Sequence, residues 1–398
     1  MASKVFSQSF LILSVLLLVV ISAAVETDIF LPSFPALKDY FNTTERTIQL
    51  LISVNFLGVY VATFFYGPLA DAFGRRPILL IGMFIFSMSS IACALVNSLE
   101  AMLLCRFVQG LGSSVAFIIP KTIIHDSFDR AKVAKTLGIY TSIMTIVISF
   151  APIIGNYLYL TFSWHANFSF VAILSIVSFL YAFFFLPESL HKEKRLNIHA
   201  KNILRNYKKI ITTPIAMANL FLCYSVGGAY FAYITNMSLI FVDHLGVSNT
   251  HYGYYQSTIL VAVAATSFSV GRIIDLIGVY HTRTLGILIT LIGSLLFFSV
   301  ALWAEQNPLF ITLSMAIFAS GSALSAGIFS ADYINVSPHI KGLAASVGRS
   351  ITVLVVLILI TTSSFFFNGT IMPVAIIVFI AGVSSFLVYE CLRRYEKI

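Results

Sequence analysis

Twelve apolar stretches of about 20 residues, the length that an α-helix needs to cross a bilayer, dominate this sequence. We predict such helices at 9–31, 47–66, 78–97, 100–124, 136–160, 168–186, 215–242, 252–271, 284–303, 309–333, 346–367 and 371–392. The composition agrees, because 59% of the 398 residues are hydrophobic and only 10% are charged, whereas soluble domains carry about 25% charged residues. We therefore expect an all-α membrane protein whose main partner is the lipid bilayer.

Lysine and arginine residues gather on one side of the predicted spans. The loops that alternate along the chain from the N-terminus carry 20 of them, whereas the opposite loops carry only Lys38 and Arg46. Loops rich in these residues stay in the cytoplasm, so we expect an inner-membrane protein with both termini cytoplasmic. The net charge of +8 is then a topology signal, and a nucleic-acid partner is not expected.

The first apolar stretch has two interpretations. Lys4 precedes it and Ser22-Ala-Ala24 would suit cleavage of a signal peptide. However, the apolar stretch continues towards Pro32, and its loss would break a pattern of six plus six spans. We favour a first helix that is retained.

A long polar segment and a repeated string divide the chain into halves. We predict an N-terminal six-helix bundle at 1–190, a cytoplasmic linker at 191–213 and a C-terminal six-helix bundle at 214–398. Ile198, Ile203, Leu204, Ile210 and Ile211 could line a surface helix on the membrane, but we favour a solvated linker.

The pattern Gly-x-x-x-Asp-x-x-Gly of Gly67–Gly74 recurs 204 residues later at Gly271–Gly278. Two such halves are typical of a transporter that rocks about a central site.

The first copy of this string joins the second and third predicted spans. Its sequence is Gly67-Pro-Leu-Ala-Asp71-Ala-Phe-Gly74-Arg75-Arg76-Pro77. Glycines allow a tight turn, and a carboxylate can meet a helix N-terminus or a cation. The string resembles the signature between helices 2 and 3 of the major facilitator superfamily. Ala72 stands where that family usually has a basic residue, so one loop contact of the family is expected to be missing.

Arg106 lies inside an apolar span, about 9 Å from its start. A charge there costs at least about 2.5 kcal/mol and requires a partner, unless the side chain snorkels to the interface. Gln109, Gly110 and Gly112 follow it, and small residues let a neighbouring helix pack closely. The whole string resembles the helix 4 signature of the proton-coupled drug antiporters.

Two carboxylates, Glu26 and Asp28, lie in the first span. Asp28 and Arg106 lie at similar depth, so we predict that they pair. Residues two apart on a helix face different directions, so one carboxylate can pair with Arg106 while the other faces a cavity. A carboxyl group in low dielectric favours its neutral form, and we therefore predict that Glu26, Asp28 and Arg106 couple transport to protons. The alternative for Glu26 is a polar residue near the outer interface.

The fifth span carries a further resemblance. Ala151-Pro152-Ile-Ile-Gly155-Asn156 is similar to the antiporter signature Gly-Pro-x-x-Gly-Gly, with two glycines replaced, and His165 stands where arginine is common. Thr27–Pro32 and Leu186–Leu190 match the ends of helices 1 and 6. The chain most resembles the bicyclomycin-resistance (Bcr/CflA) branch of the drug:proton antiporters. This resemblance implies a major facilitator fold of two six-helix bundles and export of a drug-like compound against proton entry.

Two further sets of residues are candidates. Lys121 and Asp332 lie near the cytoplasmic ends of equivalent helices in the two halves, and we predict a cytoplasmic gate, with separate snorkelling as the alternative. We predict that Tyr224, Tyr230 and Tyr233 line the substrate cavity, with plain packing as the alternative.

Other chemistry finds little support in the sequence. The four cysteines have neither zinc nor disulfide spacing, and we interpret them as packing residues. We find no Gly-x-x-x-x-Gly-Lys loop, so ATP is not expected as the energy source, and we expect no cofactor, no metal and no enzymatic activity. We expect a monomer that exports small drug-like compounds in exchange for protons. The alternative is a proton-coupled transporter of a specific metabolite, such as an amino acid, nucleoside or siderophore.

Overall fold

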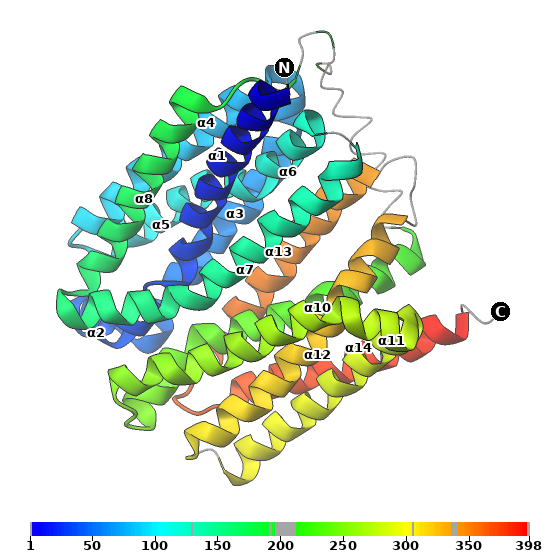
Figure 1. Cartoon of the computed structure of the whole chain (residues 1–398). Coiled ribbons are helices and arrows are strands. Elements are labelled where there is room, and N and C mark those ends of the chain that lie inside the picture. Colours follow the sequence, from blue (N-terminus) through cyan, green and yellow to red (C-terminus); the bar gives the residue numbers. More distant parts are fainter. Residues whose placement is uncertain are drawn as a thin grey trace. The chain divides into compact units, whose positions relative to one another are not determined.

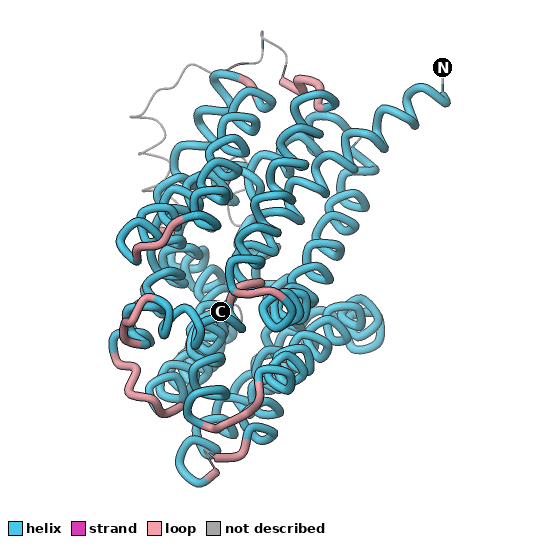
Figure 2. Tube along the Cα trace, turned by 90° about the vertical axis from the view of Figure 1, so that its left-hand side faces the viewer, coloured by secondary structure: helices cyan, strands magenta, loops and turns pink. Residues whose placement is uncertain are grey.

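The computed structural model describes residues 2–128, 130–190, 193, 195, 212–304, 306–335 and 341–395. These residues form helices and short connections, with no strand among them (Figures 1 and 2). The chain divides into two compact units, one made of Met1–Thr43 and Leu50–Ile198 and the other of Thr44–Gln49 and His199–Ile398. The predicted linker 191–213, including its possible surface helix, lies almost entirely outside the described residues.

The helices of the first half follow one another with short connections. They are α1 (Ala2–Asp28), the 3₁₀ turn η1 (Leu31–Ser33), α2 (Phe34–Tyr40), α3 (Glu45–Phe73), α4 (Arg75–Leu95), α5 (Leu99–Ser113), α6 (Val115–Ser127), α7 (Arg130–Thr161) and α8 (Trp164–Phe185). Ser98 caps α5, since its side chain accepts a hydrogen bond from the Ala101 amide at 3.3 Å. Within the first unit, α1 packs against α6, α7 and α8, and α4 packs against α5, α6 and α8.

The second half has the same character. Its helices are α10 (Pro214–Ser238), the π-helical segment η3 (Leu239–His244), α11 (Asn249–Trp303), α12 (Pro308–Asn335), α13 (Lys341–Phe365) and α14 (Met372–Tyr395). Within the second unit, α10 packs against α12, α13 and α14, and α11 packs against α12 and α14.

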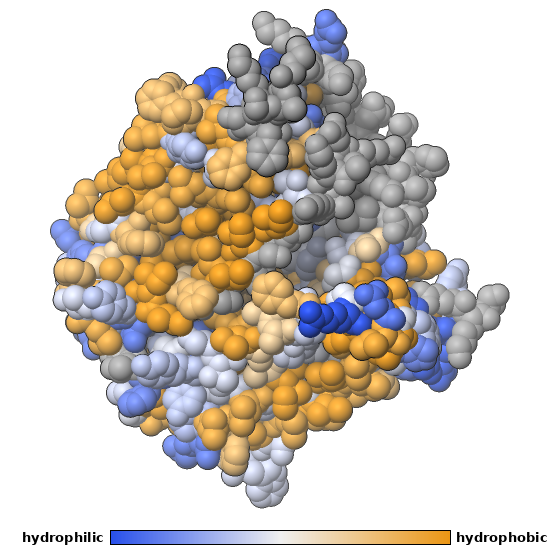
Figure 3. Space-filling model, viewed as in Figure 1, coloured by the Kyte–Doolittle hydropathy of each residue, from blue (hydrophilic) through white to orange (hydrophobic). Residues whose placement is uncertain are grey.

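Ten helices in the described part of the chain are long and apolar enough to cross a membrane. Large apolar side chains also cover much of the visible surface (Figure 3), and Leu104, Phe184 and Trp303 are among the exposed ones. A soluble protein could not expose so much apolar surface. The chain is therefore a multi-pass membrane protein.

The count of twelve spans stays a prediction. One of the ten candidates, His251–Trp303, has 53 residues, which is about 80 Å of helix against a hydrocarbon thickness of about 30 Å. Its backbone leaves the helical conformation at Gly278 (φ 80°, ψ 161°), and the sequence predicts two spans there. The fifth predicted span lies in α7, where Ile146–Thr161 is apolar but shorter than the others.

The last glycine of the repeated string has a similar backbone conformation in both copies. Gly74 has φ 109° and ψ 154°, and Gly278 has φ 80° and ψ 161°. A side chain would strain the backbone at such φ values. The glycine at the end of each copy therefore separates two helices that would otherwise run on.

A close contact between neighbouring helices also occurs at corresponding places in the two halves of the chain. A Cβ atom added at Gly112 of α5 would lie 2.4 Å from the backbone nitrogen of Phe86 in α4. A Cβ atom added at Gly321 of α12 would lie 2.4 Å from the backbone nitrogen of Thr290 in α11. Phe86 and Thr290 are 204 residues apart, the spacing of the repeated string, and Gly112 and Gly321 are 209 residues apart. The α4–α5 and α11–α12 contacts are thus equivalent, which supports a duplicated architecture.

Two glycines of α12 provide a matched test of this close contact. Gly321→Ala places a methyl group against the backbone of α11 and should cost about 1–3 kcal/mol, seen as a lower midpoint of thermal unfolding in detergent. Gly327→Ala is the control, because nothing lies within 4 Å of the added atom, and it should leave the midpoint unchanged or raise it. Equal effects of the two substitutions would contradict the packing described.

Candidate functional site

Arg106 is the centre of a buried polar network in the first unit. Its side chain is 1% exposed. The Nη1 atom donates to Oε1 of Glu26 on α1 at 2.9 Å and to Oε1 of Gln109, one turn further along α5, at 2.6 Å. Nε donates to the backbone carbonyl of Leu51 on α3 at 3.3 Å, and the guanidinium carbon lies 4.5 Å from the centre of the Phe30 ring. A guanidinium at this depth is stable only with such partners.

Neighbouring amides and a hydroxyl extend the network. The amide Nδ2 of Asn55 on α3 donates to Oε1 of Glu26 at 2.5 Å and to the Arg106 carbonyl at 3.2 Å. Gln109 donates through Nε2 to the Ser90 hydroxyl on α4 at 2.9 Å. The network therefore joins α1, α3, α4 and α5. The sequence analysis named Gln109 but missed Asn55 and Ser90, because isolated polar residues inside apolar spans carry no pattern of their own.

The predicted ion pair between Asp28 and Arg106 is wrong, since Arg106 pairs with Glu26. The prediction compared depth in the membrane, whereas the partner is decided by the face of the helix. α1 stays helical as far as Asp28, so the two carboxylates point in different directions, and Glu26 faces α5. Asp28 is 5% exposed, and its Oδ1 atom has no hydrogen-bond partner in the described structure. A buried carboxylate without a donor is costly in its charged form.

Small residues bring the backbone close to this network. A Cβ atom at Gly110 would lie 2.0 Å from the Asn55 carbonyl oxygen, and one at Gly155 would lie 1.7 Å from the Ile29 carbonyl oxygen. Gly155 belongs to α7, which also contains Pro152. Gly110 lets α5 approach α3 at Asn55, the residue that donates to Glu26. Gly155 lets α7 approach the chain at Ile29, directly after Asp28.

A second polar network surrounds the start of α4. The Arg75 side chain contacts the carboxylates of Asp71, one turn earlier, and of Asp126 on α6, where its Nε atom lies 3.2 Å from Oδ2. The Arg75 backbone amide donates to Oε1 of Glu188, just after α8, at 2.9 Å. Gly74 allows this approach, because an added Cβ atom would lie 2.4 Å from Glu188 Oε2. The network ties α3, α4, α6 and α8 together.

The remaining residues of the predicted motif have simpler surroundings. Arg76 donates through Nη2 to the Phe183 carbonyl on α8 at 2.7 Å. Gly67 lies within α3, directly before the proline of that helix, Pro68. Asp332 lies 3.4 Å from Nη1 of Arg283 within the second unit, and Lys121 is an exposed residue of α6 in the first unit. The predicted pair of Lys121 and Asp332 joins residues of different units and stays a prediction.

The predicted cavity tyrosines divide into two groups. Tyr230 and Tyr233 on α10 stack with ring centres 6.4 Å apart, and Tyr233 meets Phe297 edge-on at 5.7 Å. Tyr233 is 2% exposed, and its hydroxyl has no hydrogen-bond partner among the residues described. Tyr224 instead packs beside an apolar cluster that includes Leu220. Its surroundings therefore fit the packing alternative.

Gln256 on α11 is a residue that the sequence analysis missed. It is 1% exposed, and neither its amide oxygen nor its amide nitrogen has a partner in the described residues. Tyr252 lies one turn earlier on the same helix, and it is close enough to Tyr233 to interact electrostatically. A buried amide normally makes several hydrogen bonds, so this part of the second unit has polar groups available for a ligand or for water.

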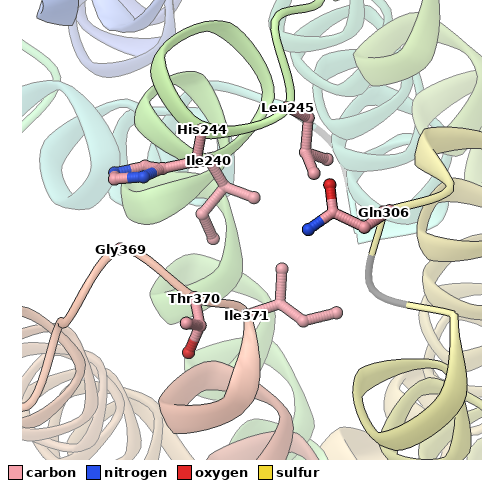
Figure 4. A pocket seen from close by; sticks show the side chains of 7 residues that line it. All are labelled: Ile240, His244, Leu245, Gln306, Gly369, Thr370 and Ile371. Carbon is pink, nitrogen blue, oxygen red and sulfur yellow. The ribbon is translucent and has the colours of Figure 1, made fainter.

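A small cavity lies elsewhere in the second unit (Figure 4). It has a volume of about 150 Å³ and is lined by Ile240, His244, Leu245, Gln306, Gly369, Thr370 and Ile371. The cavity contains none of the predicted site residues. Its lining mixes three apolar side chains with the polar side chains of His244, Gln306 and Thr370.

The family model described as Major Facilitator Superfamily matches residues 16–354. The chain belongs to the major facilitator superfamily. The family predicted from the motifs is thus confirmed, and the matching superfamily model agrees with the all-helical structure.

Relatives within the superfamily include resistance proteins. The chain is 26% identical over 251 residues to the bicyclomycin resistance protein homolog of Haemophilus influenzae, which covers 63% of each chain. It is 24% identical over 355 residues to the chloramphenicol resistance protein of Pseudomonas aeruginosa, and this alignment covers 87% of this chain and 83% of that protein. The chain thus spans less than two thirds of the first relative but most of the second. The resemblance to the bicyclomycin-resistance branch is confirmed.

Solved structures of transporters share the fold. The crystal structure of a D-xylose–proton symporter aligns with a TM-score of 0.75 at 15% identity, covering 96% of this chain and 97% of that one. The nucleoside transporter NupG, as its D323A mutant, aligns with a TM-score of 0.74 at 15% identity, covering 96% and 98%. At this identity the likeness shows the major facilitator fold alone.

A double-mutant cycle tests the assignment of the ion pair. Arg106→Met leaves the Glu26 carboxylate uncompensated and should cost about 3–5 kcal/mol, measured as the free energy of unfolding in detergent. Adding Glu26→Gln should recover part of that loss, because the two residues interact directly.

The matched control is Asp28→Asn in place of Glu26→Gln. Asp28 does not pair with Arg106, so Asp28→Asn should recover less of the loss caused by Arg106→Met than Glu26→Gln does. Coupling of Arg106 to Asp28 rather than to Glu26 would reverse the assignment.

Proposed function

We propose that this chain exports small, drug-like compounds across the inner membrane in exchange for protons. The observation that carries the proposal is the buried Glu26–Arg106 pair, with the Asp28 carboxyl group two residues away and its Oδ1 atom without a partner among the described residues. The relatives named for bicyclomycin and chloramphenicol resistance support a drug-like substrate. The positive loops support cytoplasmic termini, and we propose a monomer of two six-helix bundles at 1–190 and 214–398 joined by the linker 191–213.

Charge balance explains how the site can handle a proton. One guanidinium compensates one carboxylate, and in this structure Arg106 compensates Glu26. A second buried carboxylate would remain uncompensated, so Asp28 carries a proton while Glu26 is ionised. Releasing that proton puts a second negative charge beside Glu26 and raises the energy of the site. The cycle then relieves this charge by taking up a proton from the other side of the membrane.

The helix contacts indicate how a change at this site reaches the rest of the bundle. The network of Arg106 touches α1, α3, α4 and α5, and the network of Arg75 joins α3, α4, α6 and α8. Both networks lie in the first unit, so they favour movement of that bundle as one body, as in rocking transporters. In this proposal Lys121 and Asp332 form a gate when the cytoplasmic side closes.

The substrate would use the polar groups of the second unit. Tyr230 and Tyr233 offer flat ring faces, and Gln256 offers an amide donor and acceptor without a partner in the described residues. Aromatic rings of a ligand stack favourably on such faces. A ligand that hydrogen-bonds to the buried amide gains affinity, because the bond removes the cost of leaving the amide unpaired. Tyr224, predicted for the same cavity, packs instead beside the apolar cluster that includes Leu220. This arrangement suits a compound that is moderately apolar and has a ring with polar substituents.

Proton coupling can be measured in proteoliposomes that contain a pH-sensitive dye. Bicyclomycin and chloramphenicol serve as the first substrates, and addition of a transported compound should move protons across the membrane for the wild-type protein. Asp28→Asn cannot release a proton at that position, so proton movement should fall to the level of empty liposomes. Glu26→Gln should also abolish coupling, because it leaves Arg106 without its carboxylate.

Two controls make this test decisive. Glu100→Gln changes an exposed carboxylate in the first turn of α5, outside both polar networks, and should keep proton movement. A cell-based susceptibility screen run beside metabolite uptake separates drug export from the alternative of metabolite transport. Normal substrate-driven proton movement in Asp28→Asn, Glu26→Gln and the double variant would remove these residues from the mechanism.

A further inference from the structure

Cys93 of α4 and Cys105 of α5 lie on facing sides of the hairpin that the two helices form. Neither cysteine is in a disulfide. Cys93 is fully buried and donates to Oε1 of Gln109, one turn beyond Cys105 on α5, at 3.6 Å, whereas Cys105 is half-buried. The other two cysteines are separate, since Cys223 donates to the Ala326 carbonyl at 3.3 Å and Cys391 is exposed on α14.

The register of the two antiparallel helices produces this pair. Gly112 of α5 lies against the backbone of Phe86 in α4. Cys93 lies seven residues after Phe86 in α4, and Cys105 lies seven residues before Gly112 in the antiparallel helix α5. Seven residues are about two turns, so the faces that meet at Phe86 meet again at the cysteines. The glycine at the first contact keeps the two helices close, so short side chains face each other at the second.

The position of the pair in the hairpin gives it access to an oxidant. α4 ends at Leu95 and α5 begins at Leu99, so both cysteines lie within two turns of the connection. The distribution of positive loops predicts that this connection faces the non-cytoplasmic side. Disulfides form and persist in that compartment of a bacterial cell.

We propose that Cys93 and Cys105 are a modification site that forms a reversible disulfide with a small disulfide or a disulfide-exchange protein as the oxidant. The more exposed Cys105 reacts first: its thiolate attacks one sulfur of the oxidant, forms a mixed disulfide and releases one thiolate. The Cys93 sulfur then attacks Cys105 and releases the second thiolate. The two protons of the cysteines end on the two released thiols, so two protein thiols are oxidised as one external disulfide is reduced.

The disulfide would join two helices of one unit. It removes the S–H group that donates to Gln109, but Gln109 keeps Arg106 and Ser90 as partners. Closing the hairpin restricts the unfolded chain more than the folded one. Oxidation should therefore raise the midpoint of thermal unfolding. This inference does not depend on what the protein transports.

Thiol counting on the purified full-length chain tests the proposal. The protein is incubated in lipid nanodiscs with oxidised glutathione or with dithiothreitol, then denatured, alkylated and weighed by mass spectrometry. The reduced chain should show all four thiols, and the oxidised chain should lose two of them. Peptide mapping should identify a link between Cys93 and Cys105, and the unfolding midpoint should be higher for the oxidised protein.

Two variants and three outcomes complete the design. Cys391→Ala should still lose two thiols, whereas Cys105→Ala should leave Cys93 reduced and remove the rise in the unfolding midpoint. Persistent glutathione on Cys105 with Cys93 still free would overturn the proposal. So would a link between two chains through Cys105, or four free thiols after treatment with oxidised glutathione.

Discussion

The buried charge of Arg106 is the constraint on which the first unit depends. A guanidinium at 1% exposure requires partners for its charge, and among the described residues only its Nη2 atom has none. Glu26, Gln109 and the Leu51 carbonyl accept hydrogen bonds from it, and Phe30 covers its face. α1 and α3 must therefore approach α5 in a defined register. The glycines of α5 and α7 make these approaches possible, because any side chain there would collide with backbone atoms.

The same constraint connects structure to transport. A site with one cation and two carboxyl groups has a preferred number of protons, and changing that number costs free energy. A transporter can use this cost to link proton movement to a change of conformation. The second unit contributes something different: aromatic rings and an amide without a partner in the described residues, in surroundings suited to a ligand without a strong charge.

The sequence predicted the features that depend on the mean hydropathy of a segment or on a complete sequence motif. Hydropathy indicated the helices, and the Gly67–Gly74 string indicated both the family and the turn at Gly74. The pairing of Glu26 rather than Asp28 could not be predicted, because it depends on the rotation of α1 about its axis, which hydropathy does not fix. Gln256 and the facing positions of Cys93 and Cys105 were missed for a similar reason. Each depends on which faces of neighbouring helices meet in the packed structure.

Infrared difference spectroscopy tests the central claim most directly, because the C=O stretch of a carboxyl group reports whether it carries a proton. The purified wild-type protein in lipid should show a protonated carboxyl band that disappears as the pH is raised. Asp28→Asn should remove this band, and Glu100→Gln should keep it. A band that survives unchanged in both Asp28→Asn and Glu26→Gln would show that the proton lies elsewhere and would contradict the account.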